Sequence, residues 1–439
     1  MINDKFKILY DLSYATRGKS GIPGDTRSVA SLLTKQKNFG VDFVLFPRSY
    51  VRNSSRRNSE IYTIAEYLGK AIRPNPGRSI IPRNMEKILI LLQGINPIRN
   101  MHLLEVPASM KEKSFKFLGM SLNDNKNNLF VGTIATPSRF ARPQWNRMFK
   151  LPTKQFDFFI QQQIDPITTS KKTIHIVRLH DILPITHPEY FDDLAVNVFA
   201  RGLKTMMKNR SLVWVLDSKI NSLEFSSIFG VNSSYIPCEV GRQFTNFDIR
   251  QKKKNQIVMV NTIEPRKQVG FVVSSYMRYR ETSKSRTPLK LVIMGSKGWQ
   301  EDKLWNELVE GDYAPEIEFY PSPSNDLIQK KLQESKFVLS ASLAEGFGLP
   351  PLEGMLFGCV PVVSRIPQHM ENIGQKGIYF NQFDNESLIK SLFIAEGKAP
   401  SHKYSDSLAL SNFVKTNFGE DRVKNLWSKL LIELHTVKK

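Results

Sequence analysis

Short apolar runs alternate with longer segments of helical periodicity along most of the chain. The first run, Phe6–Tyr10, precedes a glycine-containing loop and a segment in which Val29 begins an apolar i, i+3, i+4 series. We expect Asp25 or Thr26 to cap this helix, because both side chains accept hydrogen bonds from first-turn amides. A strand, a loop and a helix in this order predict a βα unit.

Further apolar runs have the length of buried strands, and most are separated by segments long enough for a helix. They are Val41–Phe46, Ile88–Leu92, Ile174–Leu179, Leu212–Leu216, Ile257–Val260, Leu291–Met294, Phe337–Ser340 and Val360–Ser364. Such alternation predicts α/β architecture with parallel sheets covered on both faces.

Residues 237–256 contain Pro237, Gly241 and a run of basic residues, which is typical of a linker, and a new strand–loop–helix pattern follows them. We therefore predict two doubly wound, Rossmann-like domains, residues 1–240 and 241–420, facing each other across a cleft. A C-terminal helix, residues 421–439, is expected to pack back on the first domain. Ligands of such sheets bind beyond the carboxyl ends of the strands.

Length and composition agree with this organisation. A chain of 439 residues suits two domains, and no stretch approaches the roughly 18 apolar residues of a membrane span. The N-terminal residues lack the apolar core of a signal peptide. The only cysteines, Cys238 and Cys359, do not form a metal-spaced pair. We expect a reducing, cytoplasmic setting without disulfides.

The formal net charge of +21 is distributed unevenly. Residues 1–240 hold 34 Lys/Arg and 19 Asp/Glu, a balance of +15, whereas residues 241–439 hold 28 and 22, a balance of +6. The asymmetry indicates an anionic partner, which phospholipid headgroups, nucleic acid or a phosphorylated substrate would each satisfy. A well-solvated basic surface is the alternative.

The strongest chemical signal is the segment Ala344–Met355, which follows the strand run Phe337–Ser340. Its glutamates, Glu345 and Glu353, lie in a glycine loop and in the first turn of a helix whose start is marked by two prolines. Glycines allow backbone amides to approach a ligand, and a helix N-terminus favours phosphate. Taken alone, Glu353 could merely interact with the helix dipole.

Two other strand ends carry polar groups. Arg266 and Lys267 follow the strand Ile257–Val260, and adjacent cations in this loop suit a diphosphate, although a solvated turn would also hold them. His180 ends the strand Ile174–Leu179, where a purely structural histidine is the alternative.

These segments resemble the family 4 retaining glycosyltransferases of the two-Rossmann-domain (GT-B) type, in the mannosyltransferase-like branch of bacterial surface-polysaccharide assembly (O-antigen, capsule and lipopolysaccharide). The resemblance covers nearly the whole chain and is clearest in residues 174–191 and 257–371. It implies that residues 1–240 form the acceptor side and that residues 241–420 bind the nucleotide sugar.

The resemblance also implies roles for the residues of the second domain. Glu345 would face the donor sugar and Glu353 would hydrogen-bond the ribose. Lys267 would neutralise the departing diphosphate. Arg266 is the nearest replacement for an arginine that many members place where this chain has Thr262. Other donor contacts would come from the amides of Phe347, Gly348 and Leu349, and Gly295 would lie under the nucleotide base.

In the first domain the resemblance places His180 near the reacting sugar, with Asp181 as its orienting partner. The loop that contains Gly21 and Gly24 would approach the donor phosphate and the acceptor. Pro23 removes one amide from this loop, which argues against a tight phosphate cradle.

The activity so implied is transfer of mannose, or another hexose or deoxyhexose, from a GDP-, UDP- or dTDP-linked donor to a glycan or lipid-linked glycan. No cofactor or metal is expected, and Asp192-Asp193 is interpreted as a helix start. Cations and aromatics in residues 139–154 suit peripheral contact with an anionic membrane; we expect no nucleic acid partner, and the oligomeric state stays open. The alternatives are a phosphorylase or epimerase of the same fold, and a basic membrane- or nucleic-acid-binding scaffold with an inactive cleft.

Overall fold

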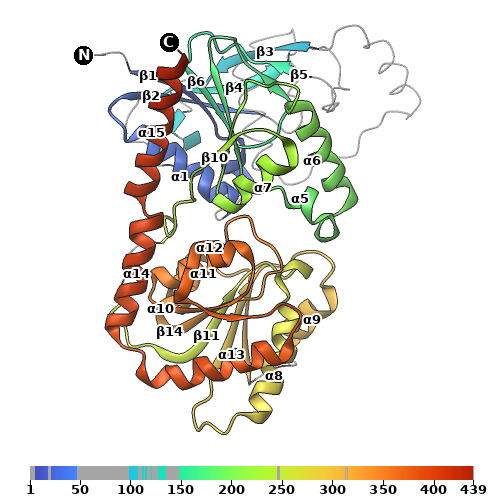
Figure 1. Cartoon of the computed structure of the whole chain (residues 1–439), viewed down its shortest axis with the longest axis vertical. Coiled ribbons are helices and arrows are strands. Elements are labelled where there is room, and N and C mark those ends of the chain that lie inside the picture. The colour runs from blue at the N-terminus through green and yellow to red at the C-terminus, as the bar shows by residue number, and fades with distance from the viewer. Residues whose placement is uncertain are drawn as a thin grey trace.

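The computed structural model describes residues 5–17, 21–46, 98–106, 111–112, 114–115, 120, 127–134, 148–244, 248–311, 313 and 315–438. They form two α/β domains, one above the other in Figure 1, and the final helix runs from the lower domain along the upper one. None of the described helices combines the length and the apolar character that crossing a membrane requires.

The first domain is built on a sheet with the strand order β10-β9-β8-β6-β1-β2-β4-β3-β5-β7. Its strands are β1 (Phe6–Asp11), β2 (Phe39–Leu45), β3 (Ile98–Glu105), β4 (Leu129–Ile134), β5 (Met148–Lys150), β6 (Phe158–Gln161), β7 (Ile167–Thr168), β8 (Ile174–Leu179), β9 (Val213–Leu216) and β10 (Ser233–Tyr235). Its helices are α1 (Ile22–Thr34), α5 (Leu183–Thr186), α6 (Asp193–Met206) and α7 (Lys219–Phe229). Strand β3 pairs antiparallel with β4, whereas the other strand pairs of the described residues in this sheet are parallel.

The second domain has a fully parallel sheet with the order β13-β12-β11-β14-β15-β16. Its strands are β11 (Lys254–Val260), β12 (Lys290–Gly295), β13 (Ile317–Pro321), β14 (Ser335–Ser340), β15 (Val360–Ser364) and β16 (Ile378–Phe380). Its helices are α8 (Val269–Thr282), α9 (Asp302–Glu310), α10 (Asn325–Glu334), α11 (Leu349–Leu356), α12 (Pro367–Ile373), α13 (Asn385–Lys398) and α14 (Tyr404–Phe418). The strand order reverses between β11 and β14, and ligands of open parallel sheets bind at such a switch point.

The predicted fold class, two doubly wound domains across a cleft, is confirmed. Strands β8 and β15 have the bounds that the apolar runs predicted, and each is buried because side chains alternate between two covered faces. Ile176 of β8 packs in the cluster that contains α1, while the adjacent Val177 packs in the cluster that contains α6 and α7. The antiparallel strand β3 departs from the expected parallel pairing, and the run Ile88–Leu92 lies outside the described residues.

The start of α1 differs from its prediction. The helix begins at Ile22, and its N-cap is Gly21, whose φ of 62° suits a glycine. Gly24 and Asp25 therefore lie inside the first turn, and the prediction that Asp25 or Thr26 caps the helix is wrong. Asp25 is buried because it forms an ion pair with Arg178 from β8.

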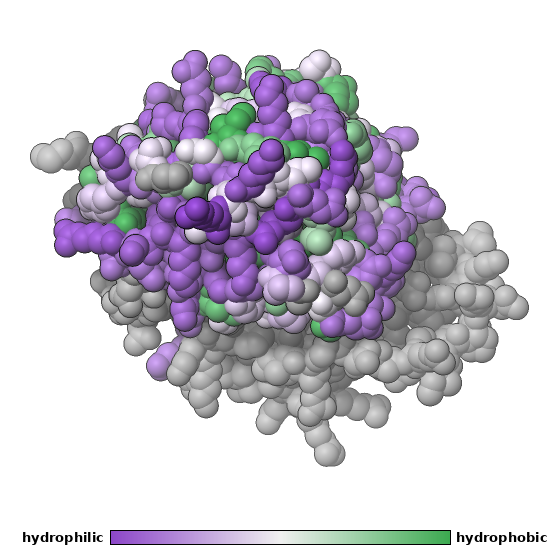
Figure 2. Space-filling model, turned by 90° about the horizontal axis from the view of Figure 1, so that it is seen from below, coloured by the Kyte–Doolittle hydropathy of each residue, from purple (hydrophilic) through white to green (hydrophobic). Residues whose placement is uncertain are grey.

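The last helix, α15 (Glu420–Lys438), packs on the first domain, beside α1 (Figure 1). Val423, Trp427 and Leu431 lie within the same hydrophobic cluster as β1, β2 and α1. The end of the molecule that belongs to the second domain is mostly hydrophilic, with small, scattered apolar patches (Figure 2).

Candidate functional site

A cleft of about 780 Å³ lies between the carboxyl ends of the two sheets. Gly21, His180 and Asp217 line it from the first domain, and Lys267, Glu345 and Glu353 line it from the second. The volume is within the range of small-molecule sites, which is roughly 300–1,000 Å³. Residues far apart in the sequence meet here because parallel strands direct the loops at their carboxyl ends to one edge.

Lys267, Arg266 and Glu345 form an ion-pair cluster on the second-domain side. The two cations lie in a 3-10 turn directly after β11, and Glu345 follows the neighbouring strand β14. The Lys267 ammonium donates to Oε1 of Glu345, and Nη1 of Arg266 lies 3.1 Å from its Oε2. Nη2 of Arg266 also pairs with Glu264 at 2.8 Å.

These contacts keep Glu345 ionised. Burial alone would raise the pKa of its carboxyl, but the charges of Lys267 and Arg266 outweigh burial and hold the pKa well below the ordinary value of 4.5. Burial lowers the pKa of Lys267, and the Glu345 carboxylate opposes this change. The cleft therefore contains a fixed carboxylate beside two cations.

The loop between Glu345 and α11 is held by side-chain amides from both domains. Nδ2 of Asn221, from α7, donates to the Gly346 carbonyl at 2.6 Å, and Nδ2 of Asn372 donates to the Phe347 carbonyl at 2.6 Å. Gly348 has a φ of 83° and is the N-cap of α11. The loop thus turns sharply and brings Gly348 and Leu349 to the cleft. Of the first three residues of α11 only Leu349 has an N–H, because the next two are prolines.

Phe347 and Leu349 contribute main chain to the cleft. The Phe347 side chain is buried in a second-domain cluster and contacts the Phe418 ring edge-on at 5.6 Å, and Leu349 packs against the same cluster. Together with Gly348 they place three consecutive amides at the N-terminus of α11.

Glu353 lies in α11 beyond the first turn, whereas the sequence predicted it within that turn, because the helix begins at Leu349. Unlike Glu345, it forms no ion pair with the described residues. Its Oε1 accepts a hydrogen bond from the Gln243 amide. Burial raises its pKa to about 7, and the single neutral hydrogen bond opposes this only weakly. The pKa of the buried Glu353 carboxyl is therefore close to neutral pH. In its protonated form this carboxyl can both donate and accept hydrogen bonds.

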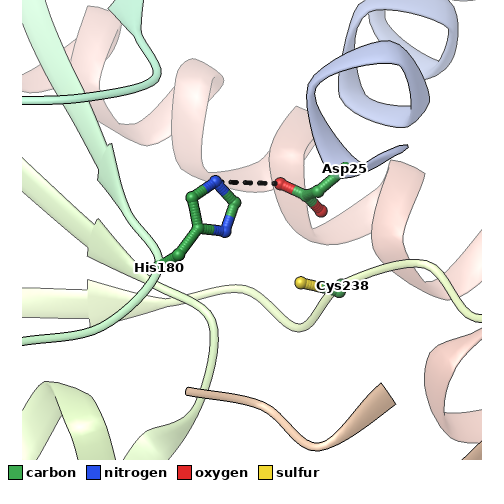
Figure 3. Close-up of side chains that lie close together, drawn as sticks. All are labelled: Asp25, His180 and Cys238. Carbon is green, nitrogen blue, oxygen red and sulfur yellow. Dashed lines mark ion pairs between the residues drawn. The ribbon is translucent and has the colours of Figure 1, made fainter. Parts of the chain in front are cut away.

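His180 directly follows β8 and faces two carboxylates of the first domain, one of which Figure 3 shows with Cys238. Its Nε2 lies 3.8 Å from Oδ2 of Asp25, and its Nδ1 lies 4.0 Å from Oδ2 of Asp217. Asp181, the expected orienting partner, instead accepts a hydrogen bond from the Leu183 amide at 3.1 Å. The prediction for Asp181 is wrong, because neighbouring residues at a strand end point in different directions.

The donor atoms of Asp25, His180 and Cys238 all lie within 4.8 Å of one another, a spacing that would suit a metal ion. The Arg178 guanidinium already bonds the Asp25 carboxylate and lies 3.6 Å from the Cys238 sulfur. A metal ion here would meet a fixed positive charge, so we assign none to this cluster.

The predicted glycines occupy different positions. Gly21 lines the cleft, whereas Gly24 lies inside α1 and is not among the lining residues. Gly295 ends β12 and lines the cleft, and a Cβ on it would lie 1.9 Å from the Asn261 carbonyl oxygen. Only glycine permits this approach of the two strand ends.

Sequence reasoning missed several residues of the cleft. Asn261 directly follows β11 and is 8 % exposed, and neither polar atom of its side chain has a hydrogen-bond partner among the described residues. Its place after a buried strand was the available signal. The turn after β13, which includes Ser322 with a φ of 48°, also lines the cleft, as does Gln243. No pattern in the sequence indicates that Gln243 meets Glu353.

Comparison with known proteins places the second domain in a family. Residues 242–394 match the model described as "Glycosyl transferases group 1", so this part of the chain is a domain of that family. The chain is 25 % identical over 227 residues to O-antigen chain mannosyltransferase B of Escherichia coli, which is 48 % of this chain and 58 % of that protein. It is 22 % identical over 229 residues to the O-antigen chain mannosyltransferase RfbU of Salmonella typhimurium, which is 50 % of this chain and 62 % of that protein. The chain thus matches about three fifths of the length of these relatives.

Solved structures share the fold over nearly the whole chain. Sucrose-phosphate synthase from Thermosynechococcus elongatus aligns with a TM-score of 0.60 at 11 % identity, covering 99 % of this chain and 100 % of that one. Anabaena HepE, solved with UDP and glucose, aligns with a TM-score of 0.54 at 12 % identity, covering 98 % and 100 %. The GT-B fold predicted from the sequence is confirmed over nearly the whole chain, and the predicted glycosyltransferase match is confirmed for residues 242–394.

The raised pKa of Glu353 predicts a pH-dependent stability. Between pH 4.5, its ordinary pKa, and about 7, the unfolded chain loses this proton while the folded chain keeps it, so stability falls as pH rises through this window. The isosteric, neutral Glu353→Gln avoids this loss. We expect its free energy of unfolding, relative to wild type, to increase by about 3 kcal/mol from pH 4.5 to 7.5.

Urea unfolding of the full chain at the two pH values measures this difference in the free energy of unfolding, taken from the transition of the second domain. The matched control is Glu310→Gln at an exposed position of α9, whose difference from wild type should be the same at both pH values. An equal pH dependence in Glu353→Gln and wild type would contradict the assignment.

Proposed function

We propose that this chain is a retaining, metal-independent glycosyltransferase that moves a sugar from a nucleoside-diphosphate sugar to a glycan or lipid-linked glycan. One observation carries the proposal: Arg266 and Lys267 lie against Glu345 beside the N-terminus of α11, at the switch point of the group 1 domain. Cations and free helix amides that face one cavity suit a pyrophosphate.

In the proposed reaction the bond between the anomeric carbon and the diphosphate oxygen breaks, and negative charge develops on the diphosphate. Lys267, Arg266 and the amides at residues 347–349 stabilise that charge. The ionised Glu345 faces the positive charge that develops on the sugar. The acceptor oxygen attacks from the face that the diphosphate leaves, and the departing diphosphate takes its proton.

The donor is proposed from the relatives. Both relatives named above are mannosyltransferases of O-antigen chains, which favours mannose carried on GDP. UDP or dTDP donors remain alternatives, because HepE was solved with UDP. The acceptor proposed is a glycan of cell-surface polysaccharide synthesis, which would place the protein in the cytoplasm. A phosphorylase or an epimerase is disfavoured by the combination of the Arg266–Lys267 turn with Glu345 and Glu353.

A panel of nucleoside diphosphates tests the proposal against the non-enzymatic scaffold. We expect GDP, UDP or dTDP to raise the melting temperature by several degrees, because a ligand of the folded state stabilises it by about 2.7 kcal/mol at 100 times its Kd. Glu353→Ala should lose most of that shift, while the exposed-site control Glu310→Ala should retain it. No shift with any nucleotide, together with strong binding to RNA or anionic vesicles, would favour the scaffold.

Lys267→Ala should reduce turnover by roughly 10²- to 10³-fold, the effect of removing one preorganised charge-stabilising donor. Arg266 remains bonded to Glu345, so this carboxylate keeps a partner and the variant should fold. The assay is release of nucleoside diphosphate from the nucleotide sugar whose diphosphate gives the largest thermal shift. Lys303→Ala, whose side chain is 92 % exposed on α9, is the control with unchanged turnover. Equal turnover in both variants would remove Lys267 from the mechanism.

We also propose a peripheral contact of the first domain with an anionic membrane. Residues 139–147 of the basic aromatic segment lie outside the described residues, and Phe149 is buried in the core. Exposed cations of the first domain include Arg201, Lys204 and Lys208 at α6, whose Leu194 is 73 % exposed.

Flotation with anionic liposomes checks this contact. Binding should occur at low salt and weaken at high salt, because each cation near the surface contributes about 1 kcal/mol that ions screen. Replacing Arg201, Lys204 and Lys208 with serine should weaken flotation strongly. Replacing Lys284, Arg286 and Lys303 of the second domain removes the same charge and should have little effect. Equal losses of flotation in the two triple variants would show that binding to the liposomes depends only on the net charge of the protein.

A further inference from the structure

A fully buried ion pair between Arg178 and Asp25 lies beneath His180. Nε of Arg178 is 3.3 Å from Oδ2 of Asp25, and Nη2 is 3.4 Å from Oδ1, so the guanidinium meets the carboxylate with two nitrogens. Arg178 is 0 % exposed and Asp25 is 5 % exposed. A pair so far from water persists only if its charges are matched and its remaining hydrogen-bonding groups are satisfied.

Arg178 joins several elements at this point. Its Nη1 donates to the carbonyls of Leu216 at the end of β9 and of Ile236 after β10. The indole of Trp427, from α15, lies 5.9 Å from the guanidinium carbon. Arg178 therefore holds strand ends, α1 and the C-terminal helix in a fixed relation.

The pair faces the histidine ring directly, as Figure 3 shows for Asp25. Oδ2 of Asp25, the oxygen bound by Nε of Arg178, is also the atom 3.8 Å from Nε2 of His180. That nitrogen is buried and has no hydrogen-bond partner among the described residues. The titratable and charged groups around the ring are Asp25 of α1, Asp217 after β9, Cys238 of the linker and Arg178 of its own strand.

We propose that Arg178 and Asp25 are a positioning pair for His180, in which Arg178 fixes the Asp25 carboxylate and cancels its charge, so that the carboxylate orients the ring without drawing a proton onto it. The inference rests on the proposed function and on the place near the reacting sugar that the sequence resemblance implies for His180, which lines the cleft. A neutral imidazole has one ring nitrogen that can accept a hydrogen bond, whereas an imidazolium only donates.

The balance of charges agrees with this role. Burial lowers the pKa of His180 to about 4, while Asp25 acts to raise it and Arg178 acts to lower it. Burial also opposes ionisation of Asp25, and the Arg178 charge leads the opposing effects that hold its pKa below the ordinary value. Without Arg178, no positive charge would oppose the Asp25 carboxylate, which acts to raise the pKa of His180.

The double variant Asp25→Asn/Arg178→Met tests the positioning role. Both charges are removed together, so no buried charge is left unpaired, but the carbonyls of Leu216 and Ile236 lose their Arg178 donor. We therefore expect the double variant to fold with a lowered melting temperature. We expect kcat to fall about 10- to 100-fold because the ring is no longer held, with little change in the Kd for the nucleoside diphosphate. Lys331→Met, which removes a paired cation of the second domain, should leave kcat unchanged. A folded double variant with the kcat of wild type would overturn the inference.

The single variant Arg178→Met tests charge cancellation. It leaves Asp25 unpaired beside the ring, so His180 should take up a proton at a higher pH than in wild type, and the double variant should titrate like wild type. Proton NMR of the ring, assigned with His180→Gln, measures this without requiring activity. An unchanged titration in Arg178→Met would contradict the proposal. If this variant does not fold, the kcat of the double variant decides.

The two levels of the argument fail differently. A wild-type protein that binds no nucleotide and releases none would remove the proposed function, whatever the variants do. If the wild-type protein is active and the folded double variant turns over the donor equally fast, only the positioning pair would be removed.

Discussion

Buried charge that must be paired is the constraint on which the cleft depends. Removing a charged group from water costs several kcal/mol even after the protein relaxes, so such a group persists only beside an opposite charge. Lys267 and Arg266 supply that charge to Glu345 on the second-domain side, and Arg178 supplies it to Asp25 on the other. Each pair joins segments far apart in the sequence. Pairing therefore both preserves ionised groups in the cleft and fixes the elements that carry them.

The two glutamates of the cleft differ in pKa because their hydrogen-bond and ion-pair partners differ, more than because of burial. Both are buried, yet the cations beside Glu345 hold its pKa well below the ordinary value, while Glu353, which accepts one hydrogen bond from the neutral amide of Gln243, has a pKa of about 7. Identical side chains eight positions apart thus differ in charge state. A fixed negative charge suits a site where positive charge develops. A carboxyl whose pKa is close to neutral pH suits hydrogen bonding to hydroxyl groups.

The alternation of apolar runs predicted the strands and the sheet class, because strands buried on both faces leave continuous apolar segments. It also indicated where the site lies, since loops at the carboxyl ends of parallel strands converge. Pairings between side chains left no such trace. Asp25 is of a residue type that often caps helices, and only its contact with Arg178 reveals its role. Gln243 lines the cleft and Asn221 bonds the loop beside it through the packing of separate elements, which no local spacing encodes.

The loop that follows Glu345 couples the cleft to the arrangement of the two domains. A Cβ on Gly346 would lie 3.0 Å from the His180 carbonyl oxygen, so the domains meet closely at this point. Asn221 donates to the Gly346 carbonyl, and the Glu371 carboxylate of α12 accepts the amides of Lys219 and Ile220 at the N-terminus of α7. These contacts cross the domain interface. Separating the domains would break them and release the loop that presents the α11 amides, so the geometry of the anion site depends on the first domain as much as on its own.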